Sequence, residues 1–219
     1  MIKTDFLVIG SGIAGMRAAL ELARQGRKVA LITKKNLLDA NTYYAQGGIA
    51  GVPLVNNKPL AGDSFEAHVN DTMKAGAGLC NKDVVNFYVK NAFEKTIVPL
   101  IDEGVDFTKS KNSNYTYSLH QEGGHSAPRI FHVADFTGRA IMETLAKRVF
   151  EEPNITVYEN HMVIDLITKE KVAKRKLDKD HCFGAYVLAN NKVIAFAARA
   201  TFLATGGAGR VYLYTSNPD

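Results

Sequence analysis

The glycine pattern Gly10-Ser-Gly-Ile-Ala-Gly15 constrains the fold of this chain more than any other feature of the sequence. It follows a short apolar run at residues 6–9 and precedes a stretch to residue 23 in which apolar residues recur with helical spacing. In such a strand, turn and helix the three glycines permit a tight turn, close approach of a pyrophosphate and close packing of helix on strand. The N–H groups at the helix N-terminus then bind the phosphate charge. The pattern therefore predicts a dinucleotide-binding unit.

A second strand at residues 28–33 completes this unit, after Gly26 at the position of a helix C-cap, and it should pair in parallel with the first strand. Dinucleotide-binding units commonly end this strand with an acidic residue that holds a ribose hydroxyl. Here Thr33 stands at that position, and Lys34 and Lys35 follow it. The departure disfavours an ordinary NAD dehydrogenase but leaves nucleotide binding open.

The rest of the chain contains helical patterns first and strand patterns afterwards. Helices are predicted at residues 63–75, 81–104 and 137–152, with the first two packed together. Strands are predicted at residues 115–120, 155–159, 163–168, 182–189, 193–198 and 201–204. This order indicates an α/β fold in which an antiparallel sheet packs beside a parallel one. Residues 216–219 form no closing element, and we expect the fold to continue beyond Asp219.

Composition excludes several classes of protein. With 46% hydrophobic residues among 219, the chain is not a disordered tail, and two isolated cysteines, Cys80 and Cys182, make no disulfide scaffold. Apolar runs are too short for a membrane-spanning helix, so we expect a soluble protein of the cytoplasm with no membrane partner. The net charge of +5 is concentrated at residues 169–179, which carry six basic and two acidic side chains. We interpret them as a solvated hairpin tip, because no aromatic residues accompany the charge as a nucleic-acid surface would require.

Two further glycine-rich segments admit alternative interpretations. They are Asn41-Thr-Tyr-Tyr-Ala-Gln-Gly-Gly48 and Leu203-Ala-Thr-Gly-Gly207. Each could be a surface loop or turn in which glycine only reverses the chain. Each could instead lie against a flat ring system, where glycine permits close approach. A second glycine-rich strand end favours the view that both approach one extended cofactor.

Glu122 is the most suggestive carboxylate, since it is flanked by Gln121, Gly123 and Gly124. Without a fold, a solvated turn followed by the start of a helix is the better explanation of this segment. Polar residues that could join it follow closely: His125, Arg129, His132, Asp135 and Arg139. The histidines lack the spacing of a zinc site, and we predict no metal. Cys182 begins an apolar strand and is interpreted as a small core residue.

Five motifs in order resemble the succinate dehydrogenase and fumarate reductase flavoprotein family. They are Gly10-Ser-Gly-Ile-Ala-Gly15, Asn41-Thr-Tyr-Tyr-Ala-Gln-Gly-Gly-Ile-Ala50, Gln121-Glu-Gly-Gly-His-Ser126, Asp135-Phe-Thr-Gly-Arg139 and Ala204-Thr-Gly-Gly207. The resemblance implies a Rossmann-like FAD-binding domain with a central parallel sheet and an added antiparallel β-meander. It also implies that residues 1–219 are the N-terminal portion of this domain. The capping domain, the C-terminal helical domain, and the catalytic arginine and histidines of the family would then lie beyond Asp219.

The resemblance also implies which residues contact FAD. They are Gly10, Ser11, Gly12, Ile13, Ala14, Gly15, Lys34, Asn41, Thr42, Tyr43, Tyr44, Ala45, Gln46, Gly47, Gly48, Met162 and Val163. In the respiratory members a histidine at the position of Asn41 is joined covalently to the flavin. An amide cannot form that bond, so FAD is expected to be noncovalent.

Within the family, Glu122 resembles the glutamate of the branch that oxidises L-aspartate to iminoaspartate on the route to NAD. It is the catalytic-site residue that the resemblance implies, as the partner of the substrate ammonium. Hydride would pass from the substrate to the flavin and on to oxygen or fumarate, and quinolinate synthase would take the imine. The alternatives are a soluble fumarate reductase and an FAD-binding fragment without catalysis.

Overall fold

A computed structural model describes residues 1–111, 115–176 and 178–217 of the chain. The chain divides into two compact units, Met1–Tyr44 with Met142–Asp219, and Ala45–Ile141. The first contains the predicted dinucleotide-binding elements, and the second contains Glu122. No helix in the described ranges is long and apolar enough to cross a membrane.

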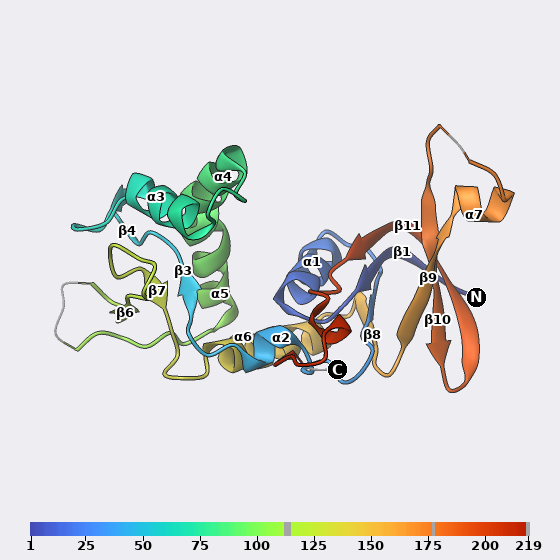
Figure 1. The fold of residues 1–219 in the computed structure, drawn as a ribbon. Coiled ribbons are helices and arrows are strands. Elements are labelled where there is room, and N and C mark those ends of the chain that lie inside the picture. The colour runs from blue at the N-terminus through green and yellow to red at the C-terminus, as the bar shows by residue number, and fades with distance from the viewer. Residues whose placement is uncertain (112–114, 177, 218–219) are drawn as a thin grey trace. The chain divides into compact units, whose positions relative to one another are not determined.

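The first unit is built on a mixed sheet that, in the described residues, has six strands in the order β8-β2-β1-β11-β10-β9 (Figure 1). The strands are β1 (Ile2–Ile9), β2 (Val29–Ile32), β8 (Ile155–Tyr158), β9 (Met162–Thr168), β10 (Cys182–Ala189) and β11 (Lys192–Leu203). The strands β8, β2, β1 and β11 are parallel, and β10 and β9 extend the sheet in antiparallel pairing. The helix α1 (Ile13–Arg24) connects β1 to β2, as the glycine pattern predicts.

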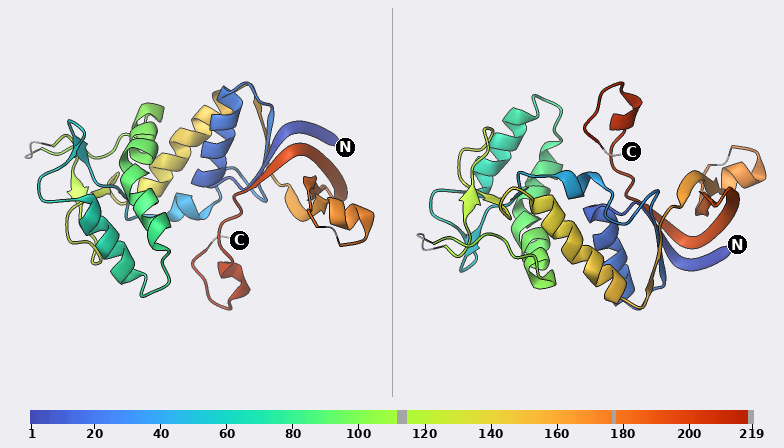
Figure 2. Two further views of the ribbon diagram at one scale, coloured as in Figure 1. Left: turned by 90° about the horizontal axis from the view of Figure 1, so that it is seen from above. Right: turned by 90° about the horizontal axis from the view of Figure 1, so that it is seen from below.

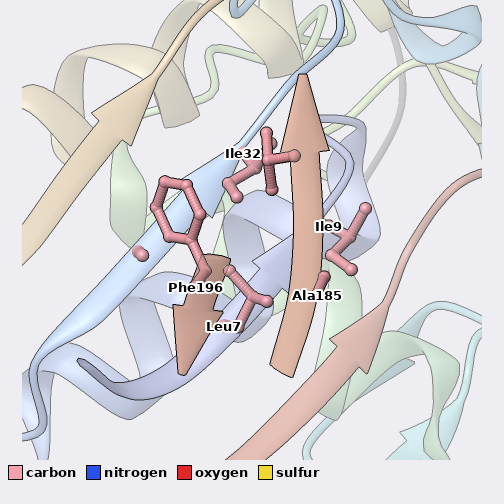
Figure 3. Close-up of a cluster of buried hydrophobic side chains, with 7 residues drawn as sticks. Leu7, Ile9, Ile32, Ala185 and Phe196 are labelled. Atoms are coloured by element: carbon pink, nitrogen blue, oxygen red, sulfur yellow. The ribbon is translucent and has the colours of Figure 1, made fainter. Parts of the chain in front are cut away.

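Apolar side chains of this sheet form a buried core. Leu7, Ile9 and Ile32 come from the parallel strands, and Ala185 and Phe196 come from β10 and β11 (Figure 3). Each is at most 5% exposed. Removal of this apolar area from water is the main driving force for the unit, at roughly 25 cal/mol per Å².

Two details of the predicted strands are wrong. The predicted strands 193–198 and 201–204 are one strand, β11, whose first half pairs with β10 and whose second half pairs with β1. Figure 2 shows β11 running alongside β1. Arg199 and Ala200 do not interrupt the strand, because a polar side chain on its exposed face leaves the backbone pairing intact. The antiparallel strands therefore continue the parallel sheet and do not form a separate sheet beside it.

The predicted basic hairpin tip is confirmed over its described residues. The short helix α7 (Lys169–Ala173) joins the antiparallel strands β9 and β10 (Figure 1). The residues from Lys171 to Lys176 are exposed. Leu177, in the same segment, lies outside the described residues.

The second unit contains the predicted pair of helices. Ser64 caps α3 (Phe65–Ala75), and Asn81 caps α4 (Lys82–Ala92). A π-helical turn, Phe93–Ile97, leads into α5 (Val98–Glu103), which ends at Gly104 in the left-handed conformation. Val69 of α3 and Val85 and Val89 of α4 form one buried cluster with Val52, so the predicted packing of the helices is confirmed.

Very short strands complete the second unit. They are β3 (Ile49–Ala50), β4 (Leu54–Val55), β5 (Lys58–Pro59), β6 (Leu119–His120) and β7 (Ile130–Phe131), with β3, β7 and β6 forming one sheet. The predicted strand 115–120 is reduced to β6 and an isolated bridge at Tyr117.

The helices not yet described are α2 (Asn41–Tyr44) and the 3₁₀ turn Gly209–Val211, both in the first unit, and α6 (Thr137–Glu151), which begins in the second unit and continues into the first.

Candidate functional site: a dinucleotide cradle and an acidic pocket

A cavity of about 680 Å³ lies in the first unit at the carboxyl ends of β1, β2 and β11. Ligands of open α/β sheets bind at such strand ends. The residues that line it are Ile9 to Ala14, Ile32 to Lys34, Asp39 to Thr42, His161 to Val163, Leu203 to Gly207, Arg210 and Asn217. The glycine-rich turn and the second glycine-rich strand end therefore meet at one cavity.

Gly10 and Gly15 are required by backbone packing. Gly10 has φ of 108°, and a Cβ there would strike the carbonyl oxygen of Ala204. A Cβ on Gly15 would strike the carbonyl oxygen of Gly10. These contacts hold the turn against β11 and the helix against the turn, which are the packing roles expected for glycine at these positions.

The N-terminus of α1 is suited to an anion. Its cap residue, Gly12, has no side chain to satisfy the helix N–H groups, and the fully described first turn carries no acidic residue. Ile13 donates its N–H to Thr42 Oγ1 at 3.4 Å. The positive end of the helix dipole therefore faces this cavity without a compensating side-chain charge.

The strand end without an acidic residue is occupied by an internal hydrogen bond. Ser11 Oγ donates to Thr33 Oγ1 at 3.0 Å, and both residues are buried. The next residue, Lys34, is exposed and lines the cavity. A cation thus stands near the site where NAD-binding folds place a carboxylate.

Ten of the predicted cofactor contacts line this cavity: Gly10, Ser11, Gly12, Ile13, Ala14, Lys34, Asn41, Thr42, Met162 and Val163. Among the described residues, Gly15, Tyr43 and Tyr44 do not line it. The predicted contacts omitted His161 and Arg210. The strand end at 203–207 was absent from the contacts that the resemblance implied, but its glycines had indicated that it approaches the cofactor, and it lines the cavity. No local pattern marks His161, which follows a turn at Asn160 with φ of 57°.

A second cavity, of about 360 Å³, lies in the second unit. It is lined by Gln46, Gly47, His120, Glu122, Ala134 and Asp135. An ideal Cβ on Gly47 would lie 3.2 Å from Glu122 Oε1, so the missing side chain leaves room for the carboxylate. Two carboxylates with no cationic Lys or Arg among the lining residues make this pocket suitable for a cation.

Ala45 and Gly48 have contacts within the second unit. Ala45 accepts a hydrogen bond through its carbonyl from the N–H of Gly138 at 2.9 Å. Gly48 has φ of 145°, and a Cβ there would strike Ile130 and the carbonyl of Phe131. The close approach of β3 and β7 therefore explains the glycine at 48, whereas its contact with FAD stays a prediction.

His120, which lines the acidic pocket, contacts a buried histidine behind it. Its ring stacks on that of His132, with centroids 3.5 Å apart and planes inclined by 17°. His132 is 4% exposed, and neither of its ring nitrogens has a hydrogen-bond partner in the described part of the chain. Burial, and then the neighbouring His120, lower the pKa of His132, so the ring is neutral at pH 7.

Together the fold and the first cavity define a dinucleotide-binding α/β protein of the Rossmann-like class. The family model described as FAD binding domain matches residues 5–219, and the chain belongs to this family. FAD is therefore its cofactor. The α1 N-terminus, which has no acidic residue in its first turn, and the small residues at the strand ends fit the pyrophosphate and the extended shape of FAD.

Curated relatives and solved structures agree with this assignment. The L-aspartate oxidases of Pseudomonas aeruginosa and Vibrio cholerae are 45% and 46% identical, over 98% and 99% of this chain. The chain spans 39% of the length of each relative. The Escherichia coli quinol fumarate reductase chain FrdA has a TM-score of 0.83 at 30% identity, and covers 99% of this chain with 34% of its own length. The Mycobacterium smegmatis Sdh1 complex gives the same TM-score at 31% identity, and the match covers 99% of this chain and 36% of the other.

Proposed function

We propose that this chain is the FAD-binding part of an enzyme that oxidises L-aspartate to iminoaspartate, the first step in forming NAD de novo. The observation that carries the proposal is Glu122, in an acidic pocket where Gly47 leaves it room. The relatives named L-aspartate oxidase support it. The proposal treats residues 1–219 as one FAD-binding domain, in keeping with the extent of the family match.

FAD supplies a hydride acceptor when it is bound. The N–H groups at the start of α1 bind its pyrophosphate, and Gly12 keeps that approach open. Glu122 accepts hydrogen bonds from the substrate ammonium, and a charge-assisted bond of this kind contributes roughly 1.5 to 3 kcal/mol. Succinate has no ammonium and would leave the carboxylate unpaired, so Glu122 discriminates between the two substrates.

The flavin is proposed to be noncovalent. Asn41 lines the first cavity, at the position where the respiratory members of the succinate dehydrogenase and fumarate reductase family carry a histidine. Its side-chain amide offers no nucleophilic nitrogen. Release of FAD on denaturation in acid would support this point, and retention on the chain would contradict it.

The proposed partners follow from the chemistry. Reduced flavin needs an acceptor, for which we propose oxygen or fumarate. Iminoaspartate is unstable in water, and quinolinate synthase is the proposed consumer. We propose the cytoplasm as the compartment; both cysteines are free thiols, which suits a reducing environment.

A soluble fumarate reductase is the second candidate, and the likeness to the quinol fumarate reductase structure favours it. An FAD-binding protein without catalysis is the third. The three candidates differ in which substrate reduces the flavin.

The test is an anaerobic visible spectrum of the FAD-loaded protein, before and after L-aspartate, with succinate in a parallel cuvette. We expect L-aspartate alone to bleach the flavin. Bleaching by succinate alone would favour the fumarate reductase. A bound flavin that neither substrate bleaches would contradict both enzymatic functions.

The role of Glu122 is tested by Glu122→Gln, which removes the charge and keeps the shape. We expect KM for L-aspartate to rise at least tenfold, since loss of about 1.4 kcal/mol or more is a factor of ten. Fumarate reduction should change much less. Glu94→Gln, an exposed carboxylate in the same unit, is the matched control. Equal losses on both substrates would remove Glu122 as the ammonium partner.

A further inference from the structure

We infer that a buried ion triad, Asp63–Arg129–Asp71, acts through Ser126 as a positioning device for Glu122 and so contributes to the preference for an amino dicarboxylate. The inference rests on the proposed function. All of these residues belong to the second unit.

The triad is centred on an arginine with no exposed surface. Arg129 donates from Nε and Nη2 to the two oxygens of Asp63, at 2.9 and 2.6 Å, and from Nη1 to Asp71 Oδ2 at 2.5 Å. The side chains of Asp63 and Asp71 are 3% and 16% exposed. Planar, bidentate pairing of this kind fixes orientation as well as distance.

Electrostatics keeps Asp71 and Arg129 charged. Burial would raise the pKa of Asp71, but the hydrogen bonds from Arg129 and Ser126 together lower it to about 2. Burial opposes the charge of Arg129, and the two carboxylates still raise its pKa. Asp71 and Arg129 therefore remain ionised throughout the physiological range, and the ion pair between them does not loosen with pH.

The triad is joined directly to the loop that carries Glu122. This loop, residues 121–129, connects β6 to β7. Asp71 Oδ2 accepts from both the N–H and the Oγ of Ser126, each at 2.8 Å. Arg129, at the end of the loop, donates its backbone N–H to the carbonyl of His120 at 3.1 Å. The triad thus holds the loop at Ser126, in its second half, and at Arg129, where the loop closes against His120.

Two hydrogen bonds within the loop connect Ser126's neighbour His125 to the residues at the loop tip, 121–124. His125 donates its N–H to the carbonyl of Glu122 at 2.9 Å, and Gln121 Nε2 donates to the carbonyl of His125 at 2.7 Å. An ideal Cβ on Gly123 or Gly124 would meet no described atom within 4 Å. Because no described side chain fixes these two glycines, the direction of the Glu122 side chain depends on the hydrogen-bonded base of the loop.

The test uses Ser126→Ala at an exposed residue. The change removes the hydrogen bond that Ser126 Oγ donates to Asp71 Oδ2 and the longer one, 3.4 Å, that it accepts from Arg129 Nη2, and leaves the Asp63–Arg129–Asp71 ion pairs in place. We expect KM for L-aspartate to rise about three- to tenfold, as loss of hydrogen bonds between this hydroxyl and charged groups allows, with kcat and fumarate reduction nearly unchanged. Ser126→Thr retains the hydroxyl and should restore KM. Hydrogen exchange at the amides of His125 and Arg129 should quicken in the alanine variant only.

A double-mutant cycle separates positioning from a general structural role. If Ser126 acts through Glu122, Ser126→Ala should add no further rise in KM when Glu122→Gln is already present. Additive effects, or equal losses on L-aspartate and fumarate, would overturn the inference. If the unchanged protein does not oxidise L-aspartate, the proposed function itself fails; unaltered amide exchange in Ser126→Ala overturns the anchor independently of any substrate.

Discussion

Ser11 Oγ and Thr33 Oγ1 are hydrogen-bonded at 3.0 Å, across the gap between the glycine-rich turn and the end of β2. Both side chains are buried beside the cavity of the first unit. The bond occupies the place where NAD-binding folds direct a carboxylate at a ribose. The missing acidic residue is therefore replaced by a neutral pair that stiffens the turn, and the charge nearest the strand end is that of Lys34.

Thr33→Val tests the structural role of this pair. The change leaves the Ser11 hydroxyl buried without an acceptor, so we expect the free energy of unfolding to fall by about 1 to 3 kcal/mol in urea denaturation. The FAD dissociation constant, measured by flavin fluorescence, should stay within about threefold, while Thr33→Ser should preserve both quantities. Weakened FAD binding with unchanged stability would instead mean that the hydroxyl contacts the nucleotide.

Gly12→Ala separates cofactor binding from folding. Gly12 has φ of −64°, which any residue adopts, and an ideal Cβ would be 3.5 Å from Thr42 Oγ1, an ordinary contact. We therefore expect the free energy of unfolding without FAD to change by less than about 0.5 kcal/mol. FAD affinity should fall at least tenfold, because the methyl group would enter the space of the pyrophosphate.

Gly26→Ala is the matched control for Gly12→Ala. Gly26 has φ of 75° and lies outside the cavity lining, so alanine there should cost about 1 kcal/mol of stability and leave FAD affinity unchanged. Equal FAD affinity in both variants would show that the pyrophosphate does not lie over Gly12.

His68 should make stability depend on pH. Burial, followed by the charge of Arg129, lowers the pKa of this 3% exposed side chain from 6.5 to about 4. Between these values the unfolded chain binds a proton that the folded chain does not. Stability is therefore full above pH 6.5 and declines as the pH falls toward 4, by roughly 3 kcal/mol.

The measurement for His68 is urea unfolding at intervals from pH 7 to pH 4, in the unchanged protein and in His68→Gln. The variant should lose most of the slope. Other groups, including His132, contribute to both curves, so the difference between them reports His68. Parallel curves would contradict a neutral buried imidazole.

The sequence predicts the first unit well because its signals are local. Apolar residues, glycines and helical spacing in the first 33 residues specify β1, α1 and β2 without any distant contact. The continuity of β11 escaped prediction since its halves pair with different strands, which local alternation does not record. The two-residue strand β7 is too short to show a period at all.

The candidate sites show the same division. The glycine turn marks the first cavity, whereas the second combines Gln46 with Glu122, which only the folded chain brings together. Glu122 was indicated by resemblance, and its sequence neighbours alone suited a solvated turn. Asp63, Asp71 and Arg129 are isolated charges in the sequence, and no spacing distinguishes a buried triad from three exposed side chains.

Gly47→Ala tests whether room beside Glu122 matters for substrate choice. Its backbone is not in the left-handed region, and the contact of an added Cβ, 3.2 Å to Glu122 Oε1, is with the end of a flexible side chain. The carboxylate would shift by a few tenths of an ångström while the fold stays intact. We expect KM for L-aspartate to rise roughly three- to tenfold, because a displaced charge-assisted hydrogen bond loses part of its strength, with little change in fumarate reduction.

The adjacent Gly48→Ala provides the contrast. Gly48 has φ of 145° and is enclosed by Ile130 and the Phe131 carbonyl, so alanine there should lower the unfolding temperature and reduce activity on both substrates together. Circular dichroism melts and steady-state kinetics of the two variants distinguish the effects. If Gly47→Ala also lowered the melting temperature and both activities alike, the residue would serve the β3–β7 packing and the pocket beside Glu122 would not set the substrate preference.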